Sequence, residues 1–542
     1  MPDKRSKNEF GIDSAVLKSI DWNLAIARVL FDMRSDFIYA PHISSVFRHS
    51  AEALIDAVES DLKNGRFAPG RPVTIEVPKS SRMQVLPRGS RGPSFSRPGS
   101  ILFPKDRLLY EMLADYAAPL IEDNTDRDRS FSHQLAKPNS SEMFKSSRAC
   151  WNQLQRTLNH LSEEHDKGYV IKADIANCFE CINQHTLVNH LDAIGYTKAF
   201  TGALDSFLVL TTGDRNSRGV PQGIVPSDLL GNFYLNPIDE RLKDLDVPSA
   251  RFVDDIYVFV SSLRHAEEVT RILTAKLRDY DLGLNESKSK LLRSRSLVTE
   301  EPDLERLFSD AFEERLEQLD EGEDIDFDYG FQSEWDDQEE SESREQKAEL
   351  HATEVLFDSV SEFPLHVEKI ERFCLPLFAA ADSRYAVDHV LENFLARPSM
   401  TQIYCAYLAK FLDDGDVVKA LAKLVIDDEL LYDWQRMWIF AAMIRNDKTT
   451  DGVIRVALRT YADGARHEAL RAVAAITAAR HGSFSRQKEL ADNYGATGSP
   501  YLQTAVLYSA RYFQKQLRRS AVKAWSAHSQ IHQLVAKSIE KI

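Results

Sequence analysis

The stretch Gly168-Tyr-Val-Ile-Lys-Ala-Asp174 decides the fold of this chain, because a short apolar run that ends on a carboxylate is typical of a buried strand. A second β-rich run, Ala250–Ser262, is interrupted by the pair Asp254-Asp255. Such a run predicts a hairpin with the two acids at its turn. Between the runs, Val225–Leu242 has helical spacing, and Pro226 is tolerated there because proline fits the first turn of a helix. The pattern predicts an α+β core with acids at the strand ends.

Composition divides the chain into four segments. Residues 1–64 have helical spacing of apolar side chains, and residues 65–299 contain the runs described above. Residues 300–345 hold 21 acidic and 3 basic side chains, so we expect a linker or solvated insertion without a core of its own. Residues 346–542 consist of Ala-, Leu- and Ile-rich helical stretches, which predict an α-helical domain. Stacked helix pairs are one arrangement that such stretches form.

The net charge of −16 does not exclude nucleic acid as a partner, because residues 300–345 carry −18 and the rest of the chain carries +2. The five cysteines are an odd number in a long chain, which argues against a disulfide framework and for a reducing compartment. No signal peptide opens the chain, and no run of about 18 apolar residues occurs. We therefore expect a soluble protein of the cytoplasm with no membrane partner.

Three segments carry residues with recognisable chemistry: Val170–Phe179, Gly219-Val-Pro-Gln-Gly223 with Ser227 and Asn232, and Phe252-Val-Asp254-Asp255. Carboxylates at a strand end and in a hairpin supply the hard oxygen ligands that Mg²⁺ prefers. Two such ions about 3.5–4 Å apart activate an attacking hydroxyl and neutralise a leaving pyrophosphate. We predict a site for two Mg²⁺ ions, with Mn²⁺ as the alternative metal, at Asp174, Ile175, Asp254 and Asp255.

These segments resemble motifs A, B and C of the reverse-transcriptase palm in composition, order and spacing, over roughly Arg71–Leu292. The resemblance implies right-hand polymerase fingers and palm in residues 65–299, followed by an all-α, helical-repeat-like C-terminal domain. It also implies a nucleotidyltransferase that adds dNTPs to a DNA product, with Asp174, Asp254 and Asp255 as catalytic residues. A lone Asp-Asp pair is more often a solvated turn, so the prediction depends on the three motifs occurring together.

The resemblance assigns roles to further residues, each of which has a plainer alternative. Phe179, five residues after Asp174, matches the steric gate that collides with a 2′-hydroxyl, although a core phenylalanine is the alternative. Gln222 and Gly223 match a turn that contacts the templating base pair, where glycine permits close approach of the backbone. Lys288 matches a catalytic lysine that protonates or pairs with pyrophosphate, and an ordinary exposed lysine is the alternative.

Residues 65–104 combine proline, glycine and serine with basic side chains, which predicts short strands and loops. Pro78-Lys79 and Arg97-Pro98 resemble the fingers of bacterial reverse transcriptases. We predict that Lys79 and Arg97 bind the incoming triphosphate, because arginine gives bidentate phosphate contacts and lysine a mobile point charge. A solvated basic loop is the alternative.

The C-terminal half distinguishes among reverse transcriptases. No ribonuclease H, integrase or Cys/His endonuclease pattern follows the palm. A palm joined to a helical domain resembles the abortive-infection (Abi) and related defence-associated bacterial enzymes. That resemblance implies antiphage DNA synthesis by a homo-oligomer, either without a template or on a noncoding RNA. The alternatives are a retron or other mobile-element enzyme, and a palm-fold scaffold whose helical domain binds a phage or host protein.

The helical domain adds two open questions. A protein hydroxyl that primes synthesis would have several candidates, including Tyr404, Tyr407, Tyr461, Tyr494, Tyr501 and Tyr508. The stretch Arg511–Lys541 has seven basic residues against Glu540, which predicts either a nucleic-acid surface or an amphipathic helix with a solvated face.

Overall fold

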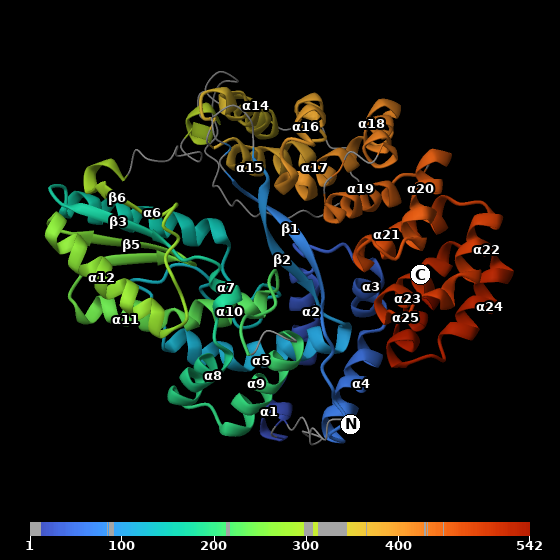
Figure 1. Ribbon diagram of the computed structural model, residues 1–542, viewed down its shortest axis with the longest axis horizontal. Helices are drawn as coiled ribbons and strands as arrows, with labels where there is room; N and C mark the ends of the chain where they lie inside the picture. The colour runs from blue at the N-terminus through green and yellow to red at the C-terminus, as the bar shows by residue number, and fades with distance from the viewer. Residues whose placement is uncertain are drawn as a thin grey trace. The chain divides into compact units, whose positions relative to one another are not determined.

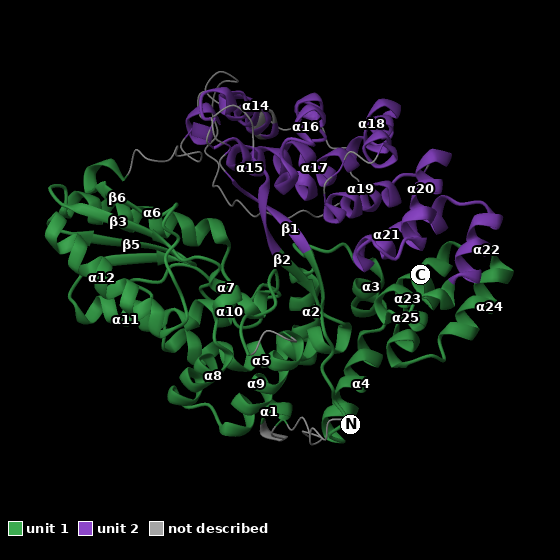
Figure 2. Ribbon diagram, in the orientation of Figure 1, with its two compact units in different colours: residues 1–75, 98–300, 494–542 green, residues 76–97, 301–493 purple. Residues whose placement is uncertain are grey.

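The computed structural model describes residues 12, 14–83, 85, 92–212, 217–297, 307–312, 344–364, 366–427, 430, 432–447 and 449–541. The chain forms two compact units, coloured separately in Figure 2. Unit 1 comprises residues 1–75, 98–300 and 494–542, and unit 2 comprises residues 76–97 and 301–493. These units differ from the four consecutive segments expected from composition, because residues 494–542 fold with the N-terminal residues.

A four-stranded sheet in the order β4-β5-β3-β6 organises the palm region of unit 1. Its strands are β3 (Tyr169–Asp174), β4 (Ser249–Phe252), β5 (Asp255–Val260) and β6 (Lys290–Arg293). All neighbouring strands are antiparallel, and the register places Asp174 directly opposite Asp255. The expected buried strand and acid-bearing hairpin are therefore confirmed, together with the mixed α and β composition of the fold.

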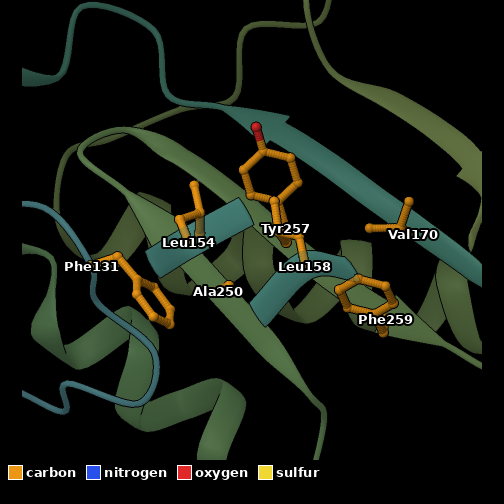
Figure 3. Packing of buried hydrophobic residues seen from close by; sticks show 7 residues of the cluster. All are labelled: Phe131, Leu154, Leu158, Val170, Ala250, Tyr257 and Phe259. Atoms are coloured by element: carbon orange, nitrogen blue, oxygen red, sulfur yellow. The ribbon is translucent and has the colours of Figure 1, made fainter. Parts of the chain in front are cut away.

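One face of this sheet packs against α6 (Ser147–Glu164), as Figure 3 shows. Leu154 and Leu158 lie four residues apart and therefore share one face of the helix. Tyr257 and Phe259 alternate with residues that point to the other face of the sheet. The buried cluster contains Phe131, Leu154, Leu158, Val170, Ala250, Tyr257 and Phe259. The cluster anchors the central strands whose ends carry the acids.

Figure 1 shows the other helices that unit 1 forms between Ser14 and Asp279. They are α1 (Ser14–Ser19), α2 (Trp22–Asp32), α3 (Pro41–His49), α4 (Ala51–Lys63), α5 (Pro104–Asp123), α7 (Cys178–Cys181), α8 (Gln184–Ala193), α9 (Lys198–Thr212), α10 (Val225–Tyr234), α11 (Asn236–Asp244) and α12 (Leu263–Asp279). The single helix expected over Val225–Leu242 is instead two helices, α10 and α11. Pro237 explains the break, because proline has no backbone N–H to continue the hydrogen-bond ladder.

The C-terminal helices α23 (Pro500–Ser509), α24 (Lys515–Trp525) and α25 (Gln530–Glu540) complete unit 1. α25 packs against α3, where Ser538 and Ser45 are hydrogen-bonded at 2.8 Å and Ser50 donates to the Leu534 carbonyl at 3.2 Å. These buried contacts join sequence positions almost 500 residues apart. They explain why this segment belongs with the N-terminal helices.

Unit 2 is mainly helical. Its helices are α14 (Arg344–Asp358), α15 (Val367–Ala380), α16 (Val387–Asn393), α17 (Thr401–Leu408), α18 (Gly415–Ile426), α19 (Asp433–Arg445), α20 (Asp451–Ala462), α21 (Glu468–His481) and α22 (Phe484–Asp492). α15, α17, α19 and α21 pack one on the next, and α18 packs on α20. This alternation is typical of stacked helix pairs. The helical C-terminal region expected from the sequence is confirmed.

A two-stranded hairpin of β1 (Val73–Arg82) and β2 (Ser94–Ile101) has its outer half in unit 2. The acidic segment 300–345 lies outside the described residues except for 307–312 and 344–345. Within it, the Phe308 ring meets the Phe373 ring edge-on at 5.5 Å between centroids. None of the helices that the structure describes is long and apolar enough to cross a membrane.

Replacing Leu154 with alanine tests the packing of α6 on the sheet. Leu154 is fully buried, so the variant should lose about 2–5 kcal/mol of unfolding free energy for unit 1. Denaturant unfolding followed by circular dichroism measures the loss. Leu263, which is 54% exposed at the start of α12, is the matched control, and its alanine variant should change stability by less than about 0.5 kcal/mol. Equal losses in the two variants would contradict this account of the core.

Candidate active site

Three carboxylates meet at one end of the palm sheet. Asp174 ends β3 and is 8% exposed, Asp255 begins β5 opposite it, and Asp254 precedes Asp255 in the hairpin turn. The Ile175 N–H donates to the Asp254 carbonyl at 3.2 Å, and the Asn285 N–H donates to the Asp174 carbonyl at 2.7 Å. Backbone hydrogen bonds on both sides of β3 therefore hold the acids in place.

The hairpin turn that carries Asp254 has an unusual backbone. Phe252 pairs with Asp255, which leaves Val253 and Asp254 as a two-residue turn. Val253 has φ of 55°, a conformation that turns of this length usually assign to glycine and that is rare for a β-branched residue. Strained backbone of this kind is concentrated at functional sites, where the surrounding structure compensates for it.

Arg251 supplies much of that compensation, and sequence reasoning missed it. Its buried guanidinium donates three hydrogen bonds to the Asp239 carboxylate, at 3.0, 2.9 and 2.6 Å, and one to the Val253 carbonyl at 3.0 Å. It also donates to Asn232 Oδ1 at 2.9 Å and Ser130 Oγ at 3.0 Å. All three guanidinium nitrogens are thus satisfied. An arginine within the apolar run Ala250–Val260 is the signal that could have revealed this network.

The acids repel one another, and the effect is strongest at Asp255. Burial and the charges of Asp254 and Asp174 raise the pKa of Asp255 to about 6, against the opposing influence of Lys172 and Lys288. Protonation of this carboxyl therefore falls within an accessible pH range. The same repulsion is what a divalent cation would relieve.

Lys288 lies at the acids, as the motif resemblance implies. Its Nζ atom donates to Asp174 Oδ2 at 2.9 Å. Burial alone would lower the pKa of Lys288, but the hydrogen bond to Asp174 and the charges of the three acids raise it overall. The side chain is accordingly a cation at neutral pH, and it partly offsets the charge of the carboxylates.

The donor set fits Mg²⁺ by its chemistry, because carboxylate oxygens are the ligands this ion prefers. Asp174, Asp254 and Asp255 would supply side-chain oxygens. Ile175 is 1% exposed with an aliphatic side chain, so only its backbone carbonyl could serve as a ligand. In the described part of the chain, no three His, Cys, Asp or Glu side chains converge closely enough to form a preformed ion site. One oxygen of Asp174 accepts the hydrogen bond from the Lys288 ammonium.

Phe179 follows Asp174 by five residues in the sequence and lies in the short helix α7. Its ring packs against α10 at Gly231, where a Cβ atom would come within 2.8 Å of Phe179 Cε1. The Val220 N–H donates to the Phe179 carbonyl at 3.1 Å. The position of the ring thus depends on a glycine in α10 that the sequence did not single out.

The Gln222-Gly223 turn precedes α10. Gly223 has φ of 83°, and a Cβ atom there would lie 2.5 Å from Phe37 Cδ2. The Ser100 N–H donates to the Gln222 carbonyl at 3.1 Å. Both the backbone conformation and the contact with Phe37 therefore require glycine at position 223. The contact of this turn with a templating base pair stays a prediction.

Lys79 and Arg97 belong to strands β1 and β2 of the two-stranded hairpin. Both are half-buried and belong to the outer half of the β1–β2 hairpin, in unit 2, whereas the acids belong to unit 1. Their assignment to the incoming triphosphate stays a prediction.

Asp255→Asn tests the electrostatic account. A raised carboxyl pKa means that the folded state binds this proton more tightly than the unfolded chain, so its contribution to stability falls as pH rises from 3.8 to about 6. In metal-free buffer, the variant should therefore gain about 1–3 kcal/mol relative to wild type on going from about pH 5 to pH 8. Thermal unfolding in EDTA measures this. Asp244→Asn, at an exposed position on α11, is the control, and a pH-independent effect of Asp255→Asn would refute the account.

Comparison with known proteins agrees with this geometry. Residues 93–335 match the family model described as reverse transcriptase (RNA-dependent DNA polymerase). The chain is 25% identical over 236 residues to the putative COX1/OXI3 intron 2 protein of Saccharomyces cerevisiae, a match that covers 42% of this chain and 23% of that protein.

Two solved structures also match this chain, with low TM-scores. They are telomerase from Candida albicans in complex with a TWJ fragment of telomeric RNA (12% identity, TM-score 0.30, 69% of each chain) and apo telomerase from Candida tropicalis (11% identity, TM-score 0.30, 69% of this chain and 73% of that one). The family match, in contrast, spans all three acids and the Gln222-Gly223 turn. Residues 93–335 are therefore similar in sequence to reverse-transcriptase domains.

Proposed function

We propose that the protein is a DNA polymerase in which Asp174, Asp254 and Asp255 hold two Mg²⁺ ions. The observation that carries this proposal is the pairing of Asp174 with Asp255 across adjacent strands, with Asp254 in the strained turn beside them. Metal ions bound there would activate a primer 3′-hydroxyl and stabilise the pyrophosphate leaving group. Lys288, whose Nζ atom donates to Asp174 Oδ2, would donate a proton to that leaving group.

Deoxynucleotides are the proposed substrates, and Phe179 is the residue that selects them. A ring packed against Gly231 would resist displacement when a 2′-hydroxyl enters the site. Discrimination by collision requires such rigidity, because a mobile ring would adapt to either sugar. The proposed turn at Gln222-Gly223 would support the templating base pair.

Loss of the acids tests the chemistry. Asp254→Asn removes a proposed metal ligand worth several kcal/mol of transition-state stabilisation, so incorporation of labelled dNTPs should fall at least about 100-fold. The assay uses purified full-length protein and Mg²⁺, with and without copurified RNA. Asp244→Asn on α11 should retain wild-type activity. Equal incorporation by wild type and Asp254→Asn would remove this site as the source of activity.

Substitution of Gly231 with alanine tests whether the packing of the Phe179 ring affects sugar selection. The added Cβ atom would displace the Phe179 ring, so the ratio of NTP to dNTP incorporation should rise, as it should in Phe179→Ala. Gly202→Ala is a matched control, because Gly202 also lies in a helix, α9, but has nothing within 4 Å of its Cβ position. An unchanged ratio in both Gly231→Ala and Phe179→Ala would show that Phe179 does not select the sugar.

The biological setting we propose is antiphage defence of the abortive-infection type, in a bacterial cell and by a homo-oligomer. The support is the stacked-helix unit that accompanies the polymerase domain. Synthesis would proceed without a template or on a noncoding RNA. Cells that carry wild type should resist phage, whereas cells that carry Asp254→Asn should not. Equal plating efficiencies for the two strains would reject the defence role.

Protein priming from the six candidate tyrosines is not supported. Tyr404, Tyr407, Tyr461, Tyr494, Tyr501 and Tyr508 are all at most 6% exposed. Burial also raises the pKa of the Tyr407 hydroxyl to about 12, which disfavours the phenolate that would attack a nucleotide. We therefore favour a nucleic-acid primer over any of these six tyrosine hydroxyls.

A mobile-element reverse transcriptase is the second candidate function. The similarity to a yeast intron 2 protein favours it, although the match covers only 23% of that protein. Sequencing of copurified RNA separates the two candidates, because a mobile-element enzyme should retain the RNA that encodes it and a defence enzyme should not.

A further inference from the structure

The C-terminal segment of unit 1 carries positive charge that the proposed catalysis does not use. Residues 494–542 contain seven lysine and arginine side chains and one acid, Glu540, in a chain whose net charge is −16. The charge is displayed on α24 and α25, which lie away from the palm sheet within unit 1 in Figure 2. A feature so concentrated calls for its own explanation.

The two helices line a groove of 790 Å³. A water molecule occupies about 30 Å³ in the liquid, so the groove accommodates a chain segment and not just a single hydrated ion. The charged residues of its lining are Lys515, Arg518, Arg519, Lys523, Lys537 and Glu540. Arg518 also donates to the Ile539 carbonyl at 2.9 Å, which fixes α24 against the end of α25.

The cations are arranged at a cost to the free protein. Lys515, Arg519 and Lys523 are spaced four residues apart, so they form one stripe along α24. Like charges at this spacing destabilise a helix by about 0.2–0.5 kcal/mol per pair, and cations near a helix N-terminus are also unfavourable. These three residues and Lys537 are exposed and make no ion pair with any described residue. An external polyanion would supply the missing counter-charge.

Nucleic acid fits this surface better than a membrane does. Helices that lie on a membrane insert apolar side chains, whereas α24 and α25 turn theirs inward. The Trp525 ring stacks on Tyr494 at 4.0 Å, and Leu534 is 3% exposed. No large hydrophobic side chain is exposed in the described part of this segment. Charge without exposed apolar surface is typical of binding to a phosphodiester backbone.

We propose that the α24–α25 groove binds the phosphodiester backbone of a nucleic-acid strand, independently of base sequence and outside the aspartate site. The four exposed cations make the phosphate contacts, and Arg518 maintains the groove. Binding here requires neither metal nor nucleotide, so it goes beyond the polymerase function and survives if that function is disproved.

The test replaces Lys515, Arg519, Lys523 and Lys537 together by glutamine in the full-length protein. Anisotropy of labelled oligouridylate and oligothymidylate, in EDTA and without dNTPs, measures affinity across a salt series. Loss of four phosphate contacts should weaken binding about 10- to 100-fold at low salt and make the salt dependence shallower by about 3 logarithmic units per decade. The two oligonucleotides show whether RNA or DNA is preferred.

A second quadruple variant controls for net charge. Lys419, Lys423, Arg455 and Lys488 are exposed in unit 2, and Lys419 and Arg455 are paired with Asp416 and Asp451. Their replacement by glutamine should leave the affinity within about twofold of wild type, because these cations belong to unit 2 and do not line the groove. Equal weakening by both variants, or unchanged affinity of the groove variant, would overturn the proposal. So would loss of binding to phosphatidylserine vesicles with oligonucleotide binding intact, because the surface would then serve a membrane.

Discussion

The buried guanidinium of Arg251 holds the turn that carries two of the three candidate catalytic acids. Three carboxylates at one end of a sheet repel one another, so other contacts must hold them there. Arg251 bonds the Val253 carbonyl and the Asp239 carboxylate at once, and this ties the strained hairpin to α11. Its contact with Asn232 extends the tie to α10. The acids are therefore held by groups that lie behind them.

Helix α10 connects this network to the nucleotide side of the site. Gly231 on one face admits the Phe179 ring, and Asn232, the next residue, binds Arg251. Tyr110 on α5 is hydrogen-bonded to Ser227 at 2.9 Å, so the helix is also fixed to the N-terminal half of unit 1. The turn that carries Asp254 and the Phe179 ring consequently both depend on contacts with one helix. A shift of α10 would disturb both.

The catalytic centre was the part of the protein most open to sequence reasoning. Local hydrophobic patterns predict the strand that ends at Asp174 and the hairpin that carries Asp254 and Asp255. The register of the strands then brings Asp174 opposite Asp255. Lys288 follows from motif spacing. Gly231 and Arg251 were missed, because their importance comes from contacts with Phe179 and Asp239, which belong to other helices of the fold. No local sequence pattern shows such contacts. The break at Pro237 was missed although its cause is local.

The sequence by itself determined the identity of the acids, the hairpin that carries two of them, and the helical character of the C-terminal half. These depend on hydrophobic periodicity and motif order over short distances. Only the tertiary structure decided that residues 494–542 leave the helical unit to pack on α3, and that six tyrosines are buried. It alone gathered the C-terminal cations around one groove. The physical reason is that packing between distant segments depends on the fit of whole surfaces, which no local pattern encodes.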